Sequence, residues 1–214
     1  MTYRPLCVAL VAFAALPVSA WAGDITTEWA SVKPPPVPQL KPVTVDSRTT
    51  ALLVLDFMKN NCGARPRCVA SVPTVKKLLD AARANNMMVV YNLTGRDPKP
   101  ADMVDQSLVP RAGEFMIVNG RGANKWYDSN LDPGLKAKGI RTVIITGTSA
   151  QGAVAGSTQG ATERGYKAIV PVDGMSAEDP YNEQYAAWHL YKGGPGNLTD
   201  NVTLTRSDLI KFAN

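Results

Sequence analysis

The chain has 214 residues, which is enough for one well-packed domain and too few for two of ordinary size. Its formal net charge is +5, and the basic residues are scattered rather than gathered in a stripe. Without a basic stripe or an aromatic-rich motif, the composition argues against a nucleic-acid partner.

The first 22 residues have the features of a secretory signal peptide. Arg4 precedes a short apolar run, LCVALVAFAALPV, and AWA stands directly before Gly23. The apolar run is too short to span a membrane as a helix. We therefore predict cleavage after Ala22, giving a periplasmic or secreted protein with no membrane association once the signal is removed.

Residues 23–48 are rich in proline and lack periodicity, which predicts an extended N-terminal arm. The segment NNCGARPRC then places Cys62 and Cys68 close together. In an oxidising compartment such a pair predicts a disulfide, which would stabilise the fold by roughly 2 kcal/mol. The alternative is a redox-active thiol pair, but the spacing is not C-x-x-C and no histidine or metal ligand is nearby.

From residue 49 to residue 214, apolar strands alternate with helices. We expect strands at 50–57, 87–92, 114–119, 142–146 and 167–172, followed by a last short strand and helix. Helices are expected at 69–82, 129–139, 151–164 and 180–191. This alternation predicts a single three-layer α/β/α domain with a central, mainly parallel sheet. Ligands of such sheets bind beyond the carboxyl ends of the strands.

Asp56 ends the most apolar strand, where a carboxylate is costly unless it is paired or used. It is therefore a candidate catalytic residue, although a helix cap or a loop ion pair would explain it equally simply. Asn60 and Asn61, just beyond it, add neutral hydrogen-bonding groups, and Asn60 is a candidate substrate-binding residue.

The segment GRGANKWYDSNL follows another strand end and supplies cations and aromatic rings. A cation beside Asp56 would lower the pKa of its carboxyl, and aromatic rings beside a cation can bind a planar or anionic ligand. Arg121 and Lys125 are the candidate cations, and Arg121, Trp126 and Tyr127 are candidate substrate-binding residues. The alternative is a pair of solvated cations with the aromatic rings packed in the core.

The stretch TGTSAQGAVAG, residues 146–156, predicts a strand end that turns into a helix of small residues. Such a helix is weak unless another element packs closely or a ligand meets its backbone. A helix N-terminus has unpaired N–H groups that attract anions, so Ser149, Gly152 and Ala153 are candidate backbone ligands of an oxyanion or carboxylate. His189 is the only histidine, which excludes a multi-histidine metal site, and we predict no metal and no cofactor.

With these residues in place, the chain resembles the isochorismatase-like, or cysteine hydrolase, superfamily over residues 48–190. The resemblance rests on ALLVLDF with Asp56, and on the segment from Gly139 to Gly174, GIRTVIITGTSAQGAVAGSTQGATERGYKAIVPVDG. It implies a parallel sheet flanked by helices, a small-molecule substrate and an Asp, Lys and Cys catalytic set. The position of the family's lysine falls near Gly120, where the closest cation is Lys125, and Arg121 is the alternative. The resemblance also leaves a homo-oligomer open.

In this resemblance the position of the catalytic cysteine falls on Ala153, and the zinc ligands of nicotinamidases have no counterpart. The isochorismatases also carry a small residue there, and an aspartate is thought to protonate their vinyl ether substrate. Ala153 is thus compatible with catalysis. We predict an exported hydrolase that uses Asp56 acid–base chemistry, assisted by Lys125, and the alternative is an inactive small-molecule binding or sensing protein. The sequence does not identify the substrate.

Overall fold

The computed structural model describes residues 23–95, 97–118, 120, 122–193 and 198–213. The signal peptide predicted for residues 1–22 lies outside the described residues. The chain forms two compact units, Met1–Pro35 and Pro36–Asn214. In the first unit, the short helix α1 (Ile25–Glu28) is capped by the side chain of Asp24 and continues into the 3-10 turn η1 (Trp29–Ser31).

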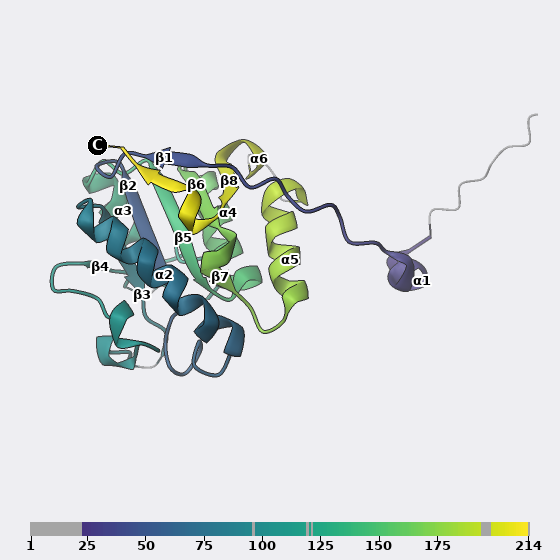
Figure 1. Ribbon diagram of the computed structural model, residues 1–214, viewed down its shortest axis with the longest axis horizontal. Helices are drawn as coiled ribbons and strands as arrows, with labels where there is room; N and C mark the ends of the chain where they lie inside the picture. Colours follow the sequence, from purple (N-terminus) through teal and green to yellow (C-terminus); the bar gives the residue numbers. More distant parts are fainter. Residues whose placement is uncertain (1–22, 96, 119, 121, 194–197, 214) are drawn as a thin grey trace, which may run out of the picture. The chain divides into compact units, whose positions relative to one another are not determined.

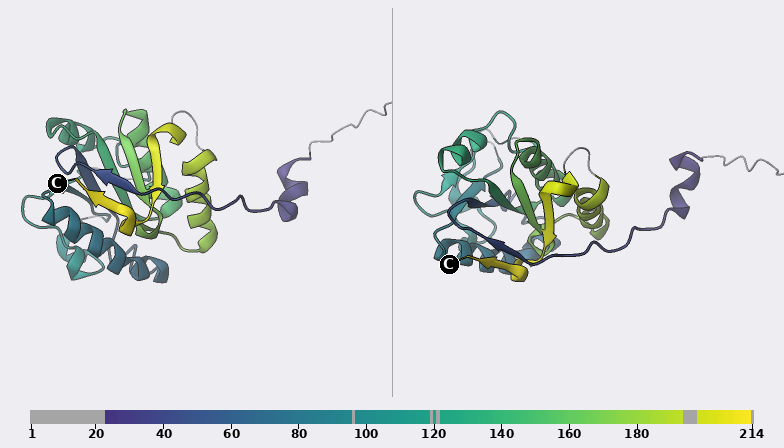
Figure 2. Two further views of the ribbon diagram at one scale, coloured as in Figure 1. Left: turned by 45° about the horizontal axis from the view of Figure 1, so that its top comes forward. Right: turned by 90° about the horizontal axis from the view of Figure 1, so that it is seen from above.

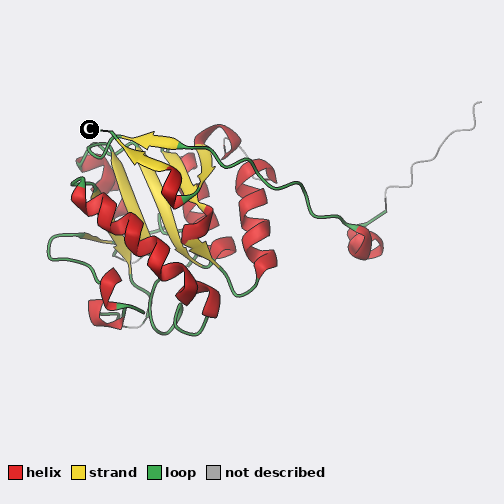
Figure 3. Ribbon diagram, in the orientation of Figure 1, coloured by secondary structure: helices red, strands yellow, loops and turns green. Residues whose placement is uncertain are grey.

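The second unit is built on a sheet in which every strand pairing is parallel. The strand order is β4-β3-β2-β5-β6-β8, with β7 paired to the end of β5. The strands are β2 (Thr50–Leu55), β3 (Met88–Asn92), β4 (Phe115–Met116), β5 (Thr142–Thr148), β6 (Lys167–Pro171), β7 (Met175–Ser176) and β8 (Val202–Thr205). Figure 3 shows these strands in yellow between red helices. The predicted parallel sheet is confirmed.

Alternate residues of β2 enter two different apolar clusters, one on each face of the sheet. On one face, Leu52 and Val54 pack with helix α2 (Pro66–Ala84), which crosses the front of the sheet in Figure 1. On the other face, Leu53 and Leu55 pack with α3 (Leu131–Ala137), α4 (Ala155–Glu163) and α5 (Pro180–Trp188). Helices therefore cover both faces of the sheet, which gives the predicted three-layer arrangement (Figure 2).

The part of the predicted arm that starts at Pro36 belongs to the second unit. Leu40 packs against the core, and β1 (Val43–Val45) pairs in parallel with β9 (Ile210–Phe212) in a separate small sheet. The remaining short elements are η2 (Pro100–Asp102), η3 (Gln106–Leu108), η5 (Val172–Gly174), η6 (His189–Gly193), α6 (Leu198–Asn201) and η7 (Ser207–Leu209).

Several element bounds differ from the predictions, most clearly in three segments. The strand predicted at 114–119 is reduced to β4, and β5 runs two residues beyond the predicted end at Thr146. The helix predicted at 151–164 begins as a π-helical turn, η4 (Ala150–Val154), before it becomes α4. It ends before Gly165, whose φ of +84° matches the expected glycine after a helix. Among the described residues, no helix is both long and apolar enough to cross a membrane.

Candidate functional site

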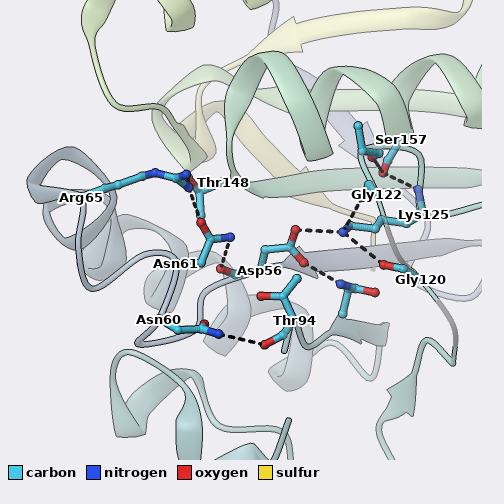
Figure 4. Close-up of polar contacts among 12 residues, drawn as sticks. Asp56, Asn60, Asn61, Arg65, Thr94, Gly120, Gly122, Lys125, Thr148 and Ser157 are labelled. Carbon is cyan, nitrogen blue, oxygen red and sulfur yellow. Dashed lines mark hydrogen bonds and ion pairs between the residues drawn. The ribbon is translucent and has the colours of Figure 1, made fainter. Parts of the chain in front are cut away.

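The centre of the candidate site is an ion pair between two buried side chains at the carboxyl edge of the sheet. Asp56 directly follows β2, and its Oδ2 lies 2.9 Å from Lys125 Nζ. The exposed fractions of the two side chains are 6% for Asp56 and 1% for Lys125. The two residues that the sequence analysis selected as catalytic therefore lie in direct contact, as Figure 4 shows.

Asn92, at the end of the neighbouring strand β3, holds the other oxygen of the Asp56 carboxylate. Its Nδ2 donates to Asp56 Oδ1 at 2.6 Å, and its carbonyl accepts from the Asp56 N–H at 3.1 Å. Asp56 has a φ of +65°, in the left-handed region that non-glycine residues seldom adopt. The carboxylate is thus held by an amide on one oxygen and by an ammonium on the other.

The Lys125 ammonium is fixed by backbone carbonyls as well as by Asp56. It donates to the carbonyl oxygens of Gly120 at 3.2 Å and Gly122 at 2.9 Å. Its own backbone N–H donates to Ser157 Oγ on α4 at 3.2 Å. The loop that carries Lys125 is therefore tied to the helix of small residues.

Close packing explains two glycines of that helix. A Cβ at Gly156 would lie 3.0 Å from the Ala123 carbonyl carbon, and one at Gly160 would lie 2.5 Å from Trp126 Cδ1 and 2.6 Å from Asn124 Oδ1. The sequence analysis left close packing and ligand approach both open for this helix. At these two positions the neighbour is the loop that positions Lys125.

Burial raises the pKa of the Asp56 carboxyl above its ordinary value of 3.8, because the charged form loses its hydration. The charge of Lys125, the hydrogen bonds from Lys125 and Asn92, and the charge of Arg65 oppose this shift. The net direction is upward. Asp56 is therefore a better proton donor near neutral pH than an exposed aspartate.

A second set of polar contacts connects Asp56 to the end of β5. Asn61 Nδ2 donates to the Asp56 carbonyl at 3.5 Å, and Arg65 Nη1 donates both to Asn61 Oδ1 and, at 3.4 Å, to Thr148 Oγ1. Thr148 Oγ1 donates in turn to the Ser176 carbonyl at 3.3 Å. Because Leu55 pairs with Gly147 in the sheet, Asp56 and Thr148 leave adjacent strands at the same edge.

At the start of the η4 turn, one of the predicted backbone donors is already used. The N–H of Gly152 donates to the Ser149 carbonyl at 3.1 Å, so this donor is used inside the turn and is not available to a ligand. The peptide bond between Thr148 and Ser149 is cis. Ala153 is 5% exposed and belongs to the core cluster on the α4 face of the sheet.

The four predicted substrate-binding residues occupy different environments. Asn60 lines a cavity of about 220 Å³ together with Thr94 and Gly95, and its Nδ2 donates to the Thr94 carbonyl at 3.4 Å. Tyr127 is 73% exposed. Arg121 lies outside the described residues.

Trp126, predicted as part of a binding wall, packs in the core instead. Its side chain stacks at 4.9 Å on Tyr166, and its indole N–H donates to the Ser157 carbonyl at 2.7 Å. This satisfied donor leaves Trp126 no polar group for a ligand, and the alternative of core packing describes it correctly.

The predicted disulfide is confirmed. Cys62 and Cys68 are bonded, and both are buried. The bond closes the loop that connects β2 to α2 and that contains Arg65. Within the described ranges, no group of three or more histidine, cysteine, aspartate or glutamate side chains is arranged to hold a metal ion.

The sequence analysis did not assign roles to Asn92, Arg65 or Thr148. Asn92 could have been selected from the sequence, because it is a polar residue at the end of an apolar strand, as Asp56 is. No sequence pattern distinguishes Arg65, because it lies in a polar loop and its contact with Thr148 is formed only when the distant segments pack together.

Comparison with known proteins gives consistent results. A family model described as the isochorismatase domain matches residues 50–201. N-carbamoylsarcosine amidase from an Arthrobacter species is 28% identical over 170 residues, which cover 66% of this chain and 63% of the relative. The match thus spans less than two thirds of that amidase. Maleamate amidohydrolase from Pseudomonas putida is 30% identical over 150 residues, covering 58% of this chain and 70% of the relative.

Solved structures agree on the fold. A cysteine hydrolase from Pseudomonas syringae pv. phaseolicola superposes with a TM-score of 0.66 at 20% identity. The alignment covers 80% of this chain and 94% of that one. At this identity the likeness concerns the arrangement of the sheet and helices.

Proposed function

Because the chain belongs to the isochorismatase family, whose domain spans residues 50–201, we propose that it hydrolyses a small molecule by proton transfer through Asp56, without a cysteine nucleophile. The observation that carries the proposal is the buried contact between Asp56 and Lys125 at the carboxyl edge of the sheet. The two named amidase relatives hydrolyse small amides, which supports a hydrolytic reaction for this chain as well.

Water is the nucleophile in this proposal. The chain has three cysteines; Cys62 and Cys68 are bonded to each other, and Cys7 lies in the predicted signal peptide. The position that the family resemblance assigns to the nucleophile is Ala153, whose methyl group carries no reactive atom. A covalent thioester is therefore not part of the mechanism.

The reaction begins with Asp56 protonated, a state that burial favours. Asp56 gives its proton to the substrate at the leaving group or at a vinyl ether carbon, and water adds to the electron-deficient carbon. The bond to the leaving group breaks, and one proton of the added water returns to Asp56. Where the first proton went to a vinyl ether carbon, the second proton of the water goes to the departing oxygen. The Lys125 ammonium stabilises the carboxylate that exists between the proton transfers from and to Asp56. We propose that the backbone around Ala153, in the η4 turn, faces the substrate oxygen that gains negative charge.

The test compares Asp56→Asn with the wild-type protein on a panel of vinyl ethers, amides and cyclic imides. General acid–base catalysis contributes about 10²–10⁴-fold, so a loss of this size is expected. Asp46→Asn is the matched control, because this aspartate is partly exposed and pairs with Arg48 near the N-terminal end of β2. Equal activity of Asp56→Asn and wild type would remove Asp56 from the mechanism. Ligand-dependent stabilisation without any product would favour the binding or sensing protein.

We also propose that the protein is exported. The disulfide supports this, because such bonds persist in oxidising compartments. Mass spectrometry of the protein recovered from the periplasm or medium should give a mature chain that begins at Gly23. An intact Met1 on protein that stays in the cytoplasm would contradict the proposal.

A further inference from the structure

Arg65 has unused hydrogen-bond donors next to the proposed catalytic site. It lies in the loop closed by the Cys62–Cys68 disulfide and is half-buried. Its Nη1 donates to Asn61 and Thr148, but its Nε and Nη2 have no acceptor among the described residues. Among the residues that the structure describes, no carboxylate lies within ion-pair distance of the Arg65 guanidinium.

The neighbouring arginine behaves differently. Arg67 forms an ion pair with Glu183 on α5, and both its Nε and its Nη2 donate to that carboxylate. Arg65, the N-cap residue of α2, and Arg67, in the first turn of α2, thus have different partners. Arg67 is satisfied by the protein, and Arg65 is not.

The surroundings of Arg65 favour an anion. It is the N-cap residue of α2, a helix of 19 residues whose N-terminus carries a partial positive charge. Thr148, which it contacts, pairs in the sheet with Ser176, a residue that is 1% exposed. The Ser176 hydroxyl is buried and has no hydrogen-bond partner among the described residues. Figure 4 shows the Arg65 side chain extended toward Thr148, with Asn61 between it and Asp56.

We propose that Arg65 binds a carboxylate of the substrate, so that the substrate class is a small molecule with a carboxylate at one end and the hydrolysed bond at the other. This inference rests on the proposed hydrolytic site at Asp56. The planar guanidinium presents Nε–H and Nη2–H in parallel, which matches the two oxygens of a carboxylate. Asn61 accepts from Arg65 and donates to the Asp56 carbonyl, so it keeps the anion-binding group at a fixed position relative to the acid.

The charge at the site depends on Asp56. With Asp56 ionised, the Asp56–Lys125 pair has no net charge, and Arg65 alone balances a singly charged carboxylate. With Asp56 protonated, Lys125 adds a second positive charge, so the binding experiment includes inorganic phosphate as a competing probe.

The experiment measures binding and turnover separately, with maleamate as the charged probe and maleamide as its neutral counterpart. Calorimetry on the wild-type protein should show tighter binding of maleamate, and Arg65→Gln should weaken maleamate binding about 10- to 100-fold. The same variant should leave maleamide binding unchanged. Arg65→Lys keeps the charge but not the planar fork, and we expect an intermediate loss. Arg67→Gln is the matched control and should keep the preference for the charged probe.

The outcomes separate this inference from the proposed function. Arg65-dependent binding of maleamate without product would support the anion site and count against hydrolysis. Turnover with no preference for maleamate over maleamide would support hydrolysis and overturn the role of Arg65. Equal weakening in Arg65→Gln and Arg67→Gln would also overturn it, as would Arg65-dependent binding of inorganic phosphate in place of maleamate.

Discussion

Lys125 Nζ lies 2.9 Å from Asp56 Oδ2, although 69 positions (125 − 56) separate the two residues in the chain. Both side chains are almost completely buried, so neither charge is screened by water. Such a pair is costly to form and more costly to break, because removing one partner leaves the other charged in a poorly hydrated position. Substitution of either residue is therefore expected to change both the activity and the free energy of unfolding.

Lys125→Met should destabilise the protein by about 3–5 kcal/mol, because it leaves the Asp56 carboxylate buried without its cation. Urea denaturation measures this change. Lys136→Met is the control, since the Lys136 side chain is 63% exposed and pairs with Asp132 one turn away on α3, and such helix pairs contribute about 0.3–0.5 kcal/mol. The double variant Asp56→Asn, Lys125→Met should lose less than the sum of its single changes. Additive losses would show that the two side chains do not interact energetically.

The dependence of kcat/KM on pH should report the raised pKa of Asp56. With protonated Asp56 as the acid, kcat/KM should fall as the pH rises through a pKa above the ordinary 3.8. Asn92→Ala removes a hydrogen bond that lowers this pKa, so the fall should move to higher pH. A profile that is unchanged in Asn92→Ala would contradict the assignment of this limb to Asp56.

The same pKa shift affects stability. The folded protein binds the Asp56 proton more tightly than the unfolded chain does. The contribution of this group to the free energy of unfolding is therefore present below pH 3.8 and is lost as the pH rises through the folded-state pKa. Comparing urea denaturation of the wild type and Asp56→Asn across this range would detect a slope that the variant lacks.

Gly160→Ala should destabilise the protein by about 1–3 kcal/mol, although alanine favours a helix over glycine by roughly 1 kcal/mol. The added methyl group would lie 2.5 Å from Trp126 Cδ1, so the loop carrying Lys125 must shift. Thermal unfolding measures the loss, and activity should fall as well. Glu163→Ala, at the exposed last residue of α4, is the control and should change little. A stabilised Gly160→Ala would show that the loop yields at low cost.

Removal of the disulfide should lower the free energy of unfolding by about 2 kcal/mol, since the bond closes a short loop. The double variant Cys62→Ala, Cys68→Ala tests this, and reductant should affect the wild type but not the variant. Because Arg65 lies in the closed loop, the variant should also bind maleamate more weakly. Two titratable thiols in the folded mature protein would contradict the bond itself.

Ala153→Cys tests whether residue 153 occupies the nucleophile position that the family resemblance assigns to it. A thiol at a helix N-terminus near a lysine has a lowered pKa and reacts faster with iodoacetamide. We expect faster labelling than for Ala155→Cys, because Ala155 is similarly buried but lies two residues further along the helix. Mass spectrometry measures both rates. Equal rates would separate residue 153 from the Asp56 and Lys125 site.

The sequence by itself determined the class of fold and the position of Asp56, one of the two residues of the buried ion pair. The apolar runs of β2, β3, β5 and β6 can be recognised locally, because a strand buried on both faces consists almost entirely of apolar residues. Once the strands are parallel, their carboxyl ends share an edge, and the position of Asp56 at that edge follows. The disulfide between Cys62 and Cys68 could likewise be predicted from the short spacing of the two cysteines.

Only the tertiary structure decided which groups meet Asp56. The segment from residue 120 to 127 offered Lys125, Arg121 and two aromatic rings, and nothing local distinguishes a buried cation from an exposed one. The choice depends on how this loop packs on α4. Gly156 leaves room for the loop backbone at Ala123, Gly160 leaves room for the side chains of Asn124 and Trp126, and Trp126 enters the core. Arg65 reaches Thr148 across 83 positions of the chain. Contacts between loops so far apart depend on the packed sheet, and a local sequence pattern does not encode them.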